Sequence, residues 1–337
     1  MSPAGAAPFH AGVASAREGV EAAWITAADG VRLRAVTWAG PPDPRGTAVI
    51  FPGRTEFAEK YGRLAGELAT LGLAAAAIDW RGQGLSDRDS QRPMLGHVGD
   101  FAEFQRDADA FLAHLEARAM PRPWILVAHS MGGGIGLRRL QDQGGFEAAV
   151  FSAPMWRLHI RTITREASNI AFRLAHLLGQ GARLTPGAKP VPTPTLGFEK
   201  NALTSDRESF DLALAQITAH PELALGGPSM QWTRAAFDEM ARIQRRPLPD
   251  IPMLVFLGSD ETVVAPAMIR RRVAGVASVR LVDLPGARHE VFMEAPEIRR
   301  QVLREIGALL DRIGAGPAPQ GATPPDQAVG SSGTRER

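Results

Sequence analysis

The sequence contains no cysteine, which excludes disulfide bonds and metal sites built from thiolates. Such a composition suits a reducing compartment, and we expect a cytoplasmic protein. The first 20 residues lack a basic segment followed by an apolar run, which argues against a secretory signal peptide. No apolar run reaches the roughly 18 residues that a transmembrane helix requires.

Lysine is also scarce, because Lys60, Lys189 and Lys200 are the only lysines among the 38 basic residues. The 36 acidic residues nearly balance them and leave a formal charge of +2. The isoelectric point near 9.5 therefore reflects the high pKa of arginine rather than an excess of positive charge. Since no long basic block occurs beyond residues 270–272, the sequence indicates no nucleic-acid partner.

What the 337 residues do contain is an alternation of short apolar runs and amphipathic segments, the pattern of a parallel α/β sheet. Asp29-Gly30 predicts a two-residue hairpin between two antiparallel strands at the start of the sheet. Buried strands are predicted at residues 47–51, 73–78, 124–128, 148–151, 252–257 and 279–284. Helices are predicted at residues 57–71, 101–120, 265–274 and 296–313.

The alternation stops at Pro154 and resumes near residue 247, which divides the chain into a core and an insertion. Residues 155–246 carry amphipathic patterns and proline-rich turns, so we expect a helical cap over the carboxyl edge of the sheet. The core then comprises residues 21–154 and 247–313. Residues 1–20 and 314–337 are rich in small residues or proline, and we expect both segments to be disordered.

One of the predicted strands, residues 124–128, ends abruptly at Ser130, and a helix begins at Met131. A nucleophile on so sharp a turn needs small residues two positions to either side, and Ala128 and Gly132 meet that need. The helix start places unpaired N–H groups beside the serine oxygen. The alternative is a serine that merely caps an ordinary helix.

A serine nucleophile requires a base and an orienting acid, which in this type of fold come later in the chain. His289 lies in a glycine-containing loop after the last predicted strand, and we expect it to be the base. The strand before it ends in Gly258-Ser259-Asp260-Glu261. The spacing favours Glu261 as the acid, with Asp260 as the alternative.

The negative charge of a tetrahedral intermediate requires two backbone donors. One is expected to be the N–H of Met131. The other should come from the loop after residues 47–51, where Gly53 allows a close approach and Arg54 N–H is the candidate. The alternative for this loop is a plain turn between a strand and a helix.

Together these residues resemble the α/β-hydrolases, in particular the branch of lysophospholipases and monoglyceride lipases, which also holds serine aminopeptidase-like members. The resemblance rests on residues 52–57, 59–61, 79–86 (Asp-x-Arg-Gly-x-Gly-x-Ser), 152–154 and 288–290, together with the Ser130 elbow and the acid loop from Gly258. The chain departs from the family in having Ala128 where glycine is usual and Glu261 where aspartate is more frequent.

The resemblance implies an α/β-hydrolase fold, with a mostly parallel doubly wound sheet and a helical cap. It also implies a serine hydrolase that cleaves the carboxylic ester of a mono-acyl lipid through an acyl-enzyme, without cofactor or metal. The alternatives are a peptidase, an acyltransferase or a perhydrolase on the same triad, or a binding protein that retains the fold without catalysis.

The cap contains a stretch, residues 157–178, that mixes apolar and arginine residues. Such a helix can contact an anionic membrane peripherally, at its inner face in a cytoplasmic protein. Alternatively, its apolar side packs on the core and only its arginines are solvated. The residues concerned are Ile160, Ile163, Ile170, Leu174, Leu177 and Leu178, with Arg157, Arg161, Arg165 and Arg173.

Overall fold

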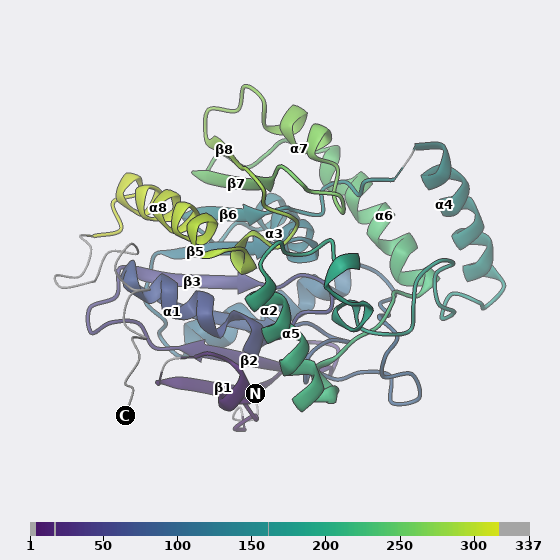
Figure 1. Cartoon of the computed structure of the whole chain (residues 1–337), viewed down its shortest axis with the longest axis horizontal. Coiled ribbons are helices and arrows are strands. Elements are labelled where there is room, and N and C mark those ends of the chain that lie inside the picture. The colour runs from purple at the N-terminus through teal and green to yellow at the C-terminus, as the bar shows by residue number, and fades with distance from the viewer. Residues whose placement is uncertain (1–4, 17, 161, 317–337) are drawn as a thin grey trace.

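The computed structural model describes residues 5–16, 18–160 and 162–316, with no description of the side chains of residues 162–167. A single eight-stranded sheet runs through this part in the order β1-β2-β4-β3-β5-β6-β7-β8 (Figure 1). β2 pairs antiparallel with β1 and β4, and all later neighbours are parallel. The predicted doubly wound α/β fold is confirmed. The strands are β1(Val20–Thr26), β2(Arg32–Trp38), β3(Gly46–Phe51), β4(Leu73–Asp79), β5(Trp124–His129), β6(Ala148–Ser152), β7(Met253–Gly258) and β8(Val279–Leu284).

The first hairpin forms as predicted, but its turn is longer than two residues. Ala27 N–H donates to Val31 O, which leaves residues 28–30 as the loop. Gly30 closes this loop at φ +86°, a conformation that glycine adopts without steric cost. The prediction of a two-residue turn was therefore wrong, because Asp-Gly also suits a three-residue loop.

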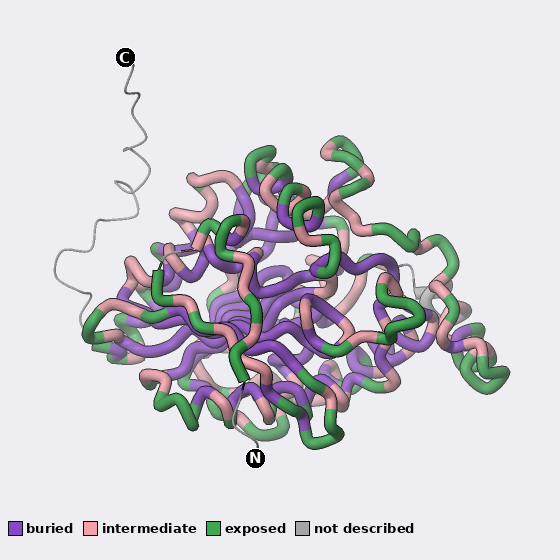
Figure 2. The backbone as a smooth tube through the Cα atoms, turned by 90° about the horizontal axis from the view of Figure 1, so that it is seen from below, coloured by how far each residue is buried: buried purple, intermediate pink, exposed green. Residues whose placement is uncertain are grey.

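Helices cover both faces of the sheet and bury its strands between two apolar layers (Figures 1 and 2). α1(Gly62–Thr70) and α8(Pro296–Arg312) pack on one face. α2(Ala102–Ala117), α3(Met131–Asp142) and α7(Pro266–Val273) pack on the other. The helix predicted from residue 57 instead opens with a 3₁₀ turn, Ala58–Tyr61, because the Asp79 carboxylate accepts the Ala58 N–H.

The segment between β6 and β7 contains three longer helices and no strand among its described residues beyond isolated bridges. These helices are α4(Thr162–Leu177), α5(Arg207–Ala219) and α6(Met230–Gln244), of which α4 and α6 lie at the right of Figure 1. Asp206 and Ser229 cap α5 and α6 by accepting N–H groups in the first helical turn. None of the described helices is both long and apolar enough to cross a membrane.

The expected disorder of residues 1–20 is wrong for the stretch 5–16. Ala6 bridges to Ala23, and Ala14 is only 1% exposed. The buried guanidinium of Arg34 donates to Pro8 O, so this stretch supplies an acceptor that the core requires.

At the other end, the packed chain continues past residue 313. The Ala315 carbonyl accepts a hydrogen bond from Arg45, and Ala315 itself is buried. The remaining stretches for which disorder was predicted, residues 1–4, 17 and 317–337, lie outside the described residues.

Candidate active site

Ser130 lies at a strained turn between β5 and α3. Its φ is +47° and its ψ is −113°, an unfavourable conformation for a residue with a Cβ. A side chain at Gly132 would overlap the Phe51 carbonyl oxygen, so the turn requires glycine there. The Ser130 side chain makes no capping hydrogen bond, which rules out the simple capping role considered from the sequence.

Three loops at the carboxyl ends of β5, β7 and β8 bring Ser130, Glu261 and His289 together. The His289 Nε2 atom lies 2.8 Å from Ser130 Oγ, and Nδ1 lies 2.7 Å from Glu261 Oε2. With the proton on Nδ1, His289 donates to Glu261 and accepts from the serine hydroxyl. His289 and Glu261 are buried, while Ser130 remains partly exposed.

Glu261, and not Asp260, contacts the histidine. The Asp260 side chain is exposed and accepts a hydrogen bond from Ser259 Oγ. The other Glu261 oxygen accepts the N–H groups of Val263 and Val264 at 2.5 and 3.0 Å. Burial raises the pKa of Glu261, but His289 and these two N–H groups outweigh it and hold the pKa below its usual value.

The loop after β3 leaves the Arg54 N–H free while the peptides around it are held. Gly53 N–H donates to the Glu56 carboxylate. Gln83 accepts the Thr55 N–H at 3.0 Å and donates to Gly53 O at 3.0 Å. No hydrogen bond of the Arg54 N–H occurs among the described residues.

The start of α3 lies directly against this loop, as the close approach of Gly132 to Phe51 O shows. Met131 is the first residue of α3, so its N–H has no partner within the helix. The two N–H groups considered from the sequence, those of Arg54 and Met131, are thus carried by adjoining segments.

A buried group of charges, which sequence reasoning missed, lies beside these residues. Lys60 Nζ bridges Glu56 Oε1 at 2.8 Å and Glu290 Oε1 at 2.7 Å. Glu56 also accepts from Gly53 N–H and Tyr61 Oη–H. Lys60 therefore links the loop that carries Arg54 N–H to the residue that follows His289.

Lys60 lowers the pKa of both carboxylates in this group, but the net shifts of the two pKa values have opposite directions. Burial raises the pKa of Glu56, but Lys60 and the hydrogen bonds outweigh it and bring the pKa to about 2. Burial and the charge of Glu56 raise the pKa of Glu290. Two signals could have indicated this group: the rarity of lysine, and the adjacency of Glu290 to His289.

His129 is the other missed residue. It is buried beneath the elbow, with its Nδ1 3.0 Å from Ser152 Oγ and its ring centroid 4.8 Å from that of His289. Burial lowers the pKa of His129 to about 4, with His289 and Lys60 acting in the same direction. It is therefore uncharged at neutral pH.

Two groups in the described part of the chain place three candidate ligand atoms within 4.8 Å of one another. In the first, Glu56, His129 and Glu290, the ammonium of Lys60 already supplies the positive charge. In the second, the rings of His10 and His220 are stacked 3.6 Å apart beside Glu222. His10 Nε2 and His220 Nδ1 each lie 3.2 Å from the same carboxylate oxygen, Glu222 Oε1.

The Asp-x-Arg-Gly-x-Gly-x-Ser stretch is architectural. Arg81 donates to Asp107 and Asp29 and joins the loop to α2 and to the first hairpin. Asp79 is buried with Arg34 and accepts the N–H groups of Ala58 and Leu85. These contacts hold the loop that presents Gln83.

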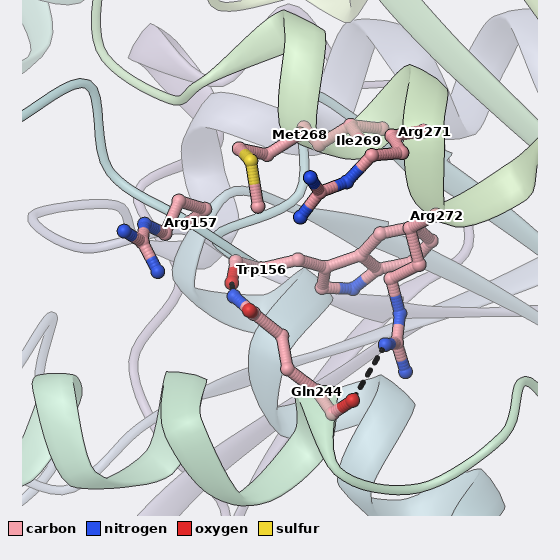
Figure 3. A pocket seen from close by; sticks show the side chains of 7 residues that line it. All are labelled: Trp156, Arg157, Gln244, Met268, Ile269, Arg271 and Arg272. Atoms are coloured by element: carbon pink, nitrogen blue, oxygen red, sulfur yellow. Dashed lines mark hydrogen bonds between the residues drawn. The ribbon is translucent and has the colours of Figure 1, made fainter.

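A cavity of about 250 Å³ lies between α6 and α7 and contains none of the triad residues (Figure 3). Arg272 donates to Gln244 O at its edge. The lining residues are Trp156, Arg157, Gln244, Met268, Ile269, Arg271 and Arg272. A second, narrower cavity of about 30 Å³ lies between the cap and the Lys60–Glu290 pair, with Phe57, Leu203, Ile217 and Leu225 in its wall. Only the second adjoins the residues around His289.

The fold and the strained serine elbow define an α/β-hydrolase. The family model described as "Serine aminopeptidase, S33" matches residues 42–296, and the chain belongs to this family. It is 31% identical over 308 residues to lysophospholipase L2 of Escherichia coli K12, covering 86% of each chain. It is also 31% identical to monoacylglycerol lipase of Mycolicibacterium smegmatis, covering 82% of this chain and 92% of that relative.

Solved structures agree on the fold. A soluble variant of monoglyceride lipase from Saccharomyces cerevisiae, in complex with a substrate analogue, superposes with a TM-score of 0.67 at 22% identity. The match covers 86% of this chain and 94% of the yeast chain. The resemblance to the lysophospholipase and monoglyceride lipase branch is confirmed.

Proposed function

We propose that this ester hydrolase cleaves mono-acyl lipids through a Ser130-His289-Glu261 triad and an acyl-enzyme. The observation that carries the proposal is the continuous chain from Ser130 Oγ through His289 to Glu261, with contacts of 2.8 and 2.7 Å. The names of the relatives, lysophospholipase and monoacylglycerol lipase, support a substrate with one acyl chain.

In this mechanism Ser130 Oγ attacks the ester carbonyl while its proton passes to His289 Nε2. The Arg54 and Met131 N–H groups donate hydrogen bonds to the negatively charged oxygen of the tetrahedral intermediate. His289 then protonates the leaving alcohol, and water hydrolyses the acyl-enzyme. Glu261 keeps the imidazole in the tautomer that accepts the serine proton.

Labelling with a fluorophosphonate probe tests this mechanism, with wild type, Ser130→Ala and His289→Ala compared. We expect labelling to require Ser130, and turnover of lysophosphatidylcholine or monoacylglycerol to fall by about 10⁶-fold in either variant. A folded wild-type protein that neither reacts with the probe nor hydrolyses any ester would instead favour a non-catalytic binding protein.

The peptidase alternative lacks support in the described part of the chain. An aminopeptidase requires an acidic anchor for the substrate amino group. Glu199, Glu208 and Glu222 of the cap are all exposed, and Glu222 contacts His10 and His220 instead.

We further propose that α4 contacts a membrane surface, since its outer face is apolar and exposed. Ile170, Leu174, Leu177 and Leu178 share one helical face and are 55–78% exposed. Phe172 instead is buried and lies 6.3 Å from Phe237 of α6. The alternative in which these leucines pack on the core is therefore wrong, although Ile163 and Arg165 lie among the undescribed side chains and Arg161 outside the described residues.

Vesicle co-sedimentation tests this contact. We expect binding to anionic vesicles at low salt to exceed binding to neutral ones, because Arg173 beside the apolar face is 60% exposed, although it lies 3.3 Å from Asp238. Leu174→Ser with Leu177→Ser should reduce binding by about 10-fold or more, as each leucine contributes roughly 1.5–3 kcal/mol on burial. Equal binding to anionic and neutral vesicles would refute the electrostatic part of the proposal.

A further inference from the structure

Arg54 is a partly buried arginine that has no carboxylate partner. Arg34 and Arg81, by contrast, are paired with Glu59 and Asp107. Among the described residues no acid lies within ion-pair distance of Arg54, and desolvation alone lowers its pKa to about 10. The guanidinium thus remains cationic at neutral pH with its charge uncompensated.

In the part of the chain that the structure describes, the Arg54 guanidinium makes a single hydrogen bond. Its Nη1 donates to Gly226 O at 2.8 Å, while a guanidinium has five N–H donors. Arg88, a nearby arginine that also lacks a carboxylate, instead distributes its donors over four carbonyl oxygens. Arg54 therefore keeps terminal donors for an anionic ligand, whereas carbonyl oxygens occupy both terminal nitrogens of Arg88.

The side chain of Arg54 extends from the loop beside Ser130 toward the cap. Its guanidinium carbon lies 5.6 Å from the centre of the Trp232 ring, at the start of α6. Nη1 is also close to Gly96, where an added Cβ would lie 3.3 Å away. The backbone N–H of the same residue is the proposed oxyanion donor, so one residue carries both this donor and the cation.

We propose that the Arg54 guanidinium forms a phosphate subsite, which makes this enzyme prefer mono-acyl lipids with a phosphate headgroup over neutral monoacylglycerols. The inference rests on the proposed function, because the proposed reaction places the substrate ester at Ser130. In such lipids a glycerol backbone joins the ester to the phosphate, so one substrate molecule carries both the group that reacts at Ser130 and the group that the guanidinium would bind. Arginine binds phosphate oxygens in a bidentate manner, and neither neutral headgroups nor cations gain from this site.

Calorimetric binding of two non-hydrolysable lipids tests the subsite independently of catalysis. The probes are 1-O-octylglycerol and 1-O-octylglycero-3-phosphocholine, both below their micellar concentrations. We expect wild type to bind the phosphate lipid more tightly, and Arg54→Gln to reduce the ratio of the two affinities by about 10- to 100-fold. Arg54→Lys should retain part of the preference, because it keeps the charge.

Arg245→Gln, at an exposed position after α6, is the control for loss of one positive charge and should leave the ratio unchanged. Near-ultraviolet circular dichroism checks that each variant is folded. If Arg54→Gln does not fold, Arg54→Lys replaces it in the comparison. Equal binding of the two lipids by wild type, or a ratio insensitive to Arg54 substitution, would overturn the proposal. A phosphate preference without any ester turnover would sustain the subsite while refuting the proposed reaction.

Discussion

At the scale of single residues, the choice between two adjacent carboxylates has a measurable consequence. Glu261→Gln should lower kcat by about 10²- to 10⁴-fold, because an amide at this position no longer fixes the tautomer of His289. Asp260→Asn should retain kcat within about twofold, since Asp260 is exposed and contacts Ser259. Hydrolysis of a soluble p-nitrophenyl ester measures both. A larger loss in Asp260→Asn than in Glu261→Gln would contradict the assignment.

The buried Lys60 beside the triad occupies a position that suits lysine better than arginine. Its ammonium joins two carboxylates from distant parts of the chain, Glu56 and Glu290. An arginine would bring a larger planar group with five donors into a space that holds one nitrogen between two oxygens. This accounts for a lysine at this position in a chain that has only two others, Lys189 and Lys200.

At the scale of elements, the contact between α3 and the end of β3 depends on Gly132. We expect Gly132→Ala to destabilise the protein by about 1–3 kcal/mol and to reduce kcat, because its Cβ would overlap the Phe51 carbonyl beside the oxyanion loop. Urea denaturation and ester turnover measure the two effects.

Gly307 in α8 provides the matched control. An added Cβ there would meet Leu71 at an ordinary 3.7 Å, so Gly307→Ala should stabilise the protein by about 0.5–1 kcal/mol with kcat unchanged. If both alanine variants shifted stability in the same direction, the steric explanation for Gly132 would fail.

The cap helix α4 illustrates an element whose pattern does not determine its environment. An apolar face at helical spacing fits a core contact or an exposed surface equally well. The structure turns Phe172 toward α6 and leaves Leu177 and Leu178 exposed. That orientation follows from the contact with α6, which the sequence pattern of α4 does not encode.

At the scale of the whole molecule, stability should depend on pH through the buried His129. Its pKa is about 4 in the fold and about 6.5 in the unfolded chain, so the unfolded state binds more protons between these values. The stability that neutral His129 contributes is therefore present above pH 6.5. It is lost as the pH falls toward 4, at up to about 1.4 kcal/mol per pH unit. The charges of Glu56, Lys60 and His289 all act on the pKa of His129.

Urea denaturation of wild type and His129→Asn at several pH values isolates the pH-dependent stability that is due to His129. The free energy of unfolding of wild type should fall relative to the variant by about 3 kcal/mol between pH 7 and pH 4. If the difference in unfolding free energy between wild type and variant stayed constant over this range, His129 would not be buried in its uncharged form.

The sequence by itself determined the sheet, the elbow and the order of Ser130, Glu261 and His289. These features depend on local signals, namely apolar runs, small residues at a tight turn and loops that follow strands. Spacing also favoured Glu261 over Asp260, and the structure brings Glu261 to the histidine.

Only the tertiary structure decided the rest, because it depends on contacts between residues far apart in the chain. Lys60 meets Glu290 across 230 positions, and Arg54 meets Gly226 across 172. The packing of residues 5–16 likewise depends on Arg34, whose need for acceptors arises only once the strands bury it. Burial creates these requirements, and a linear pattern does not show which groups will be buried together.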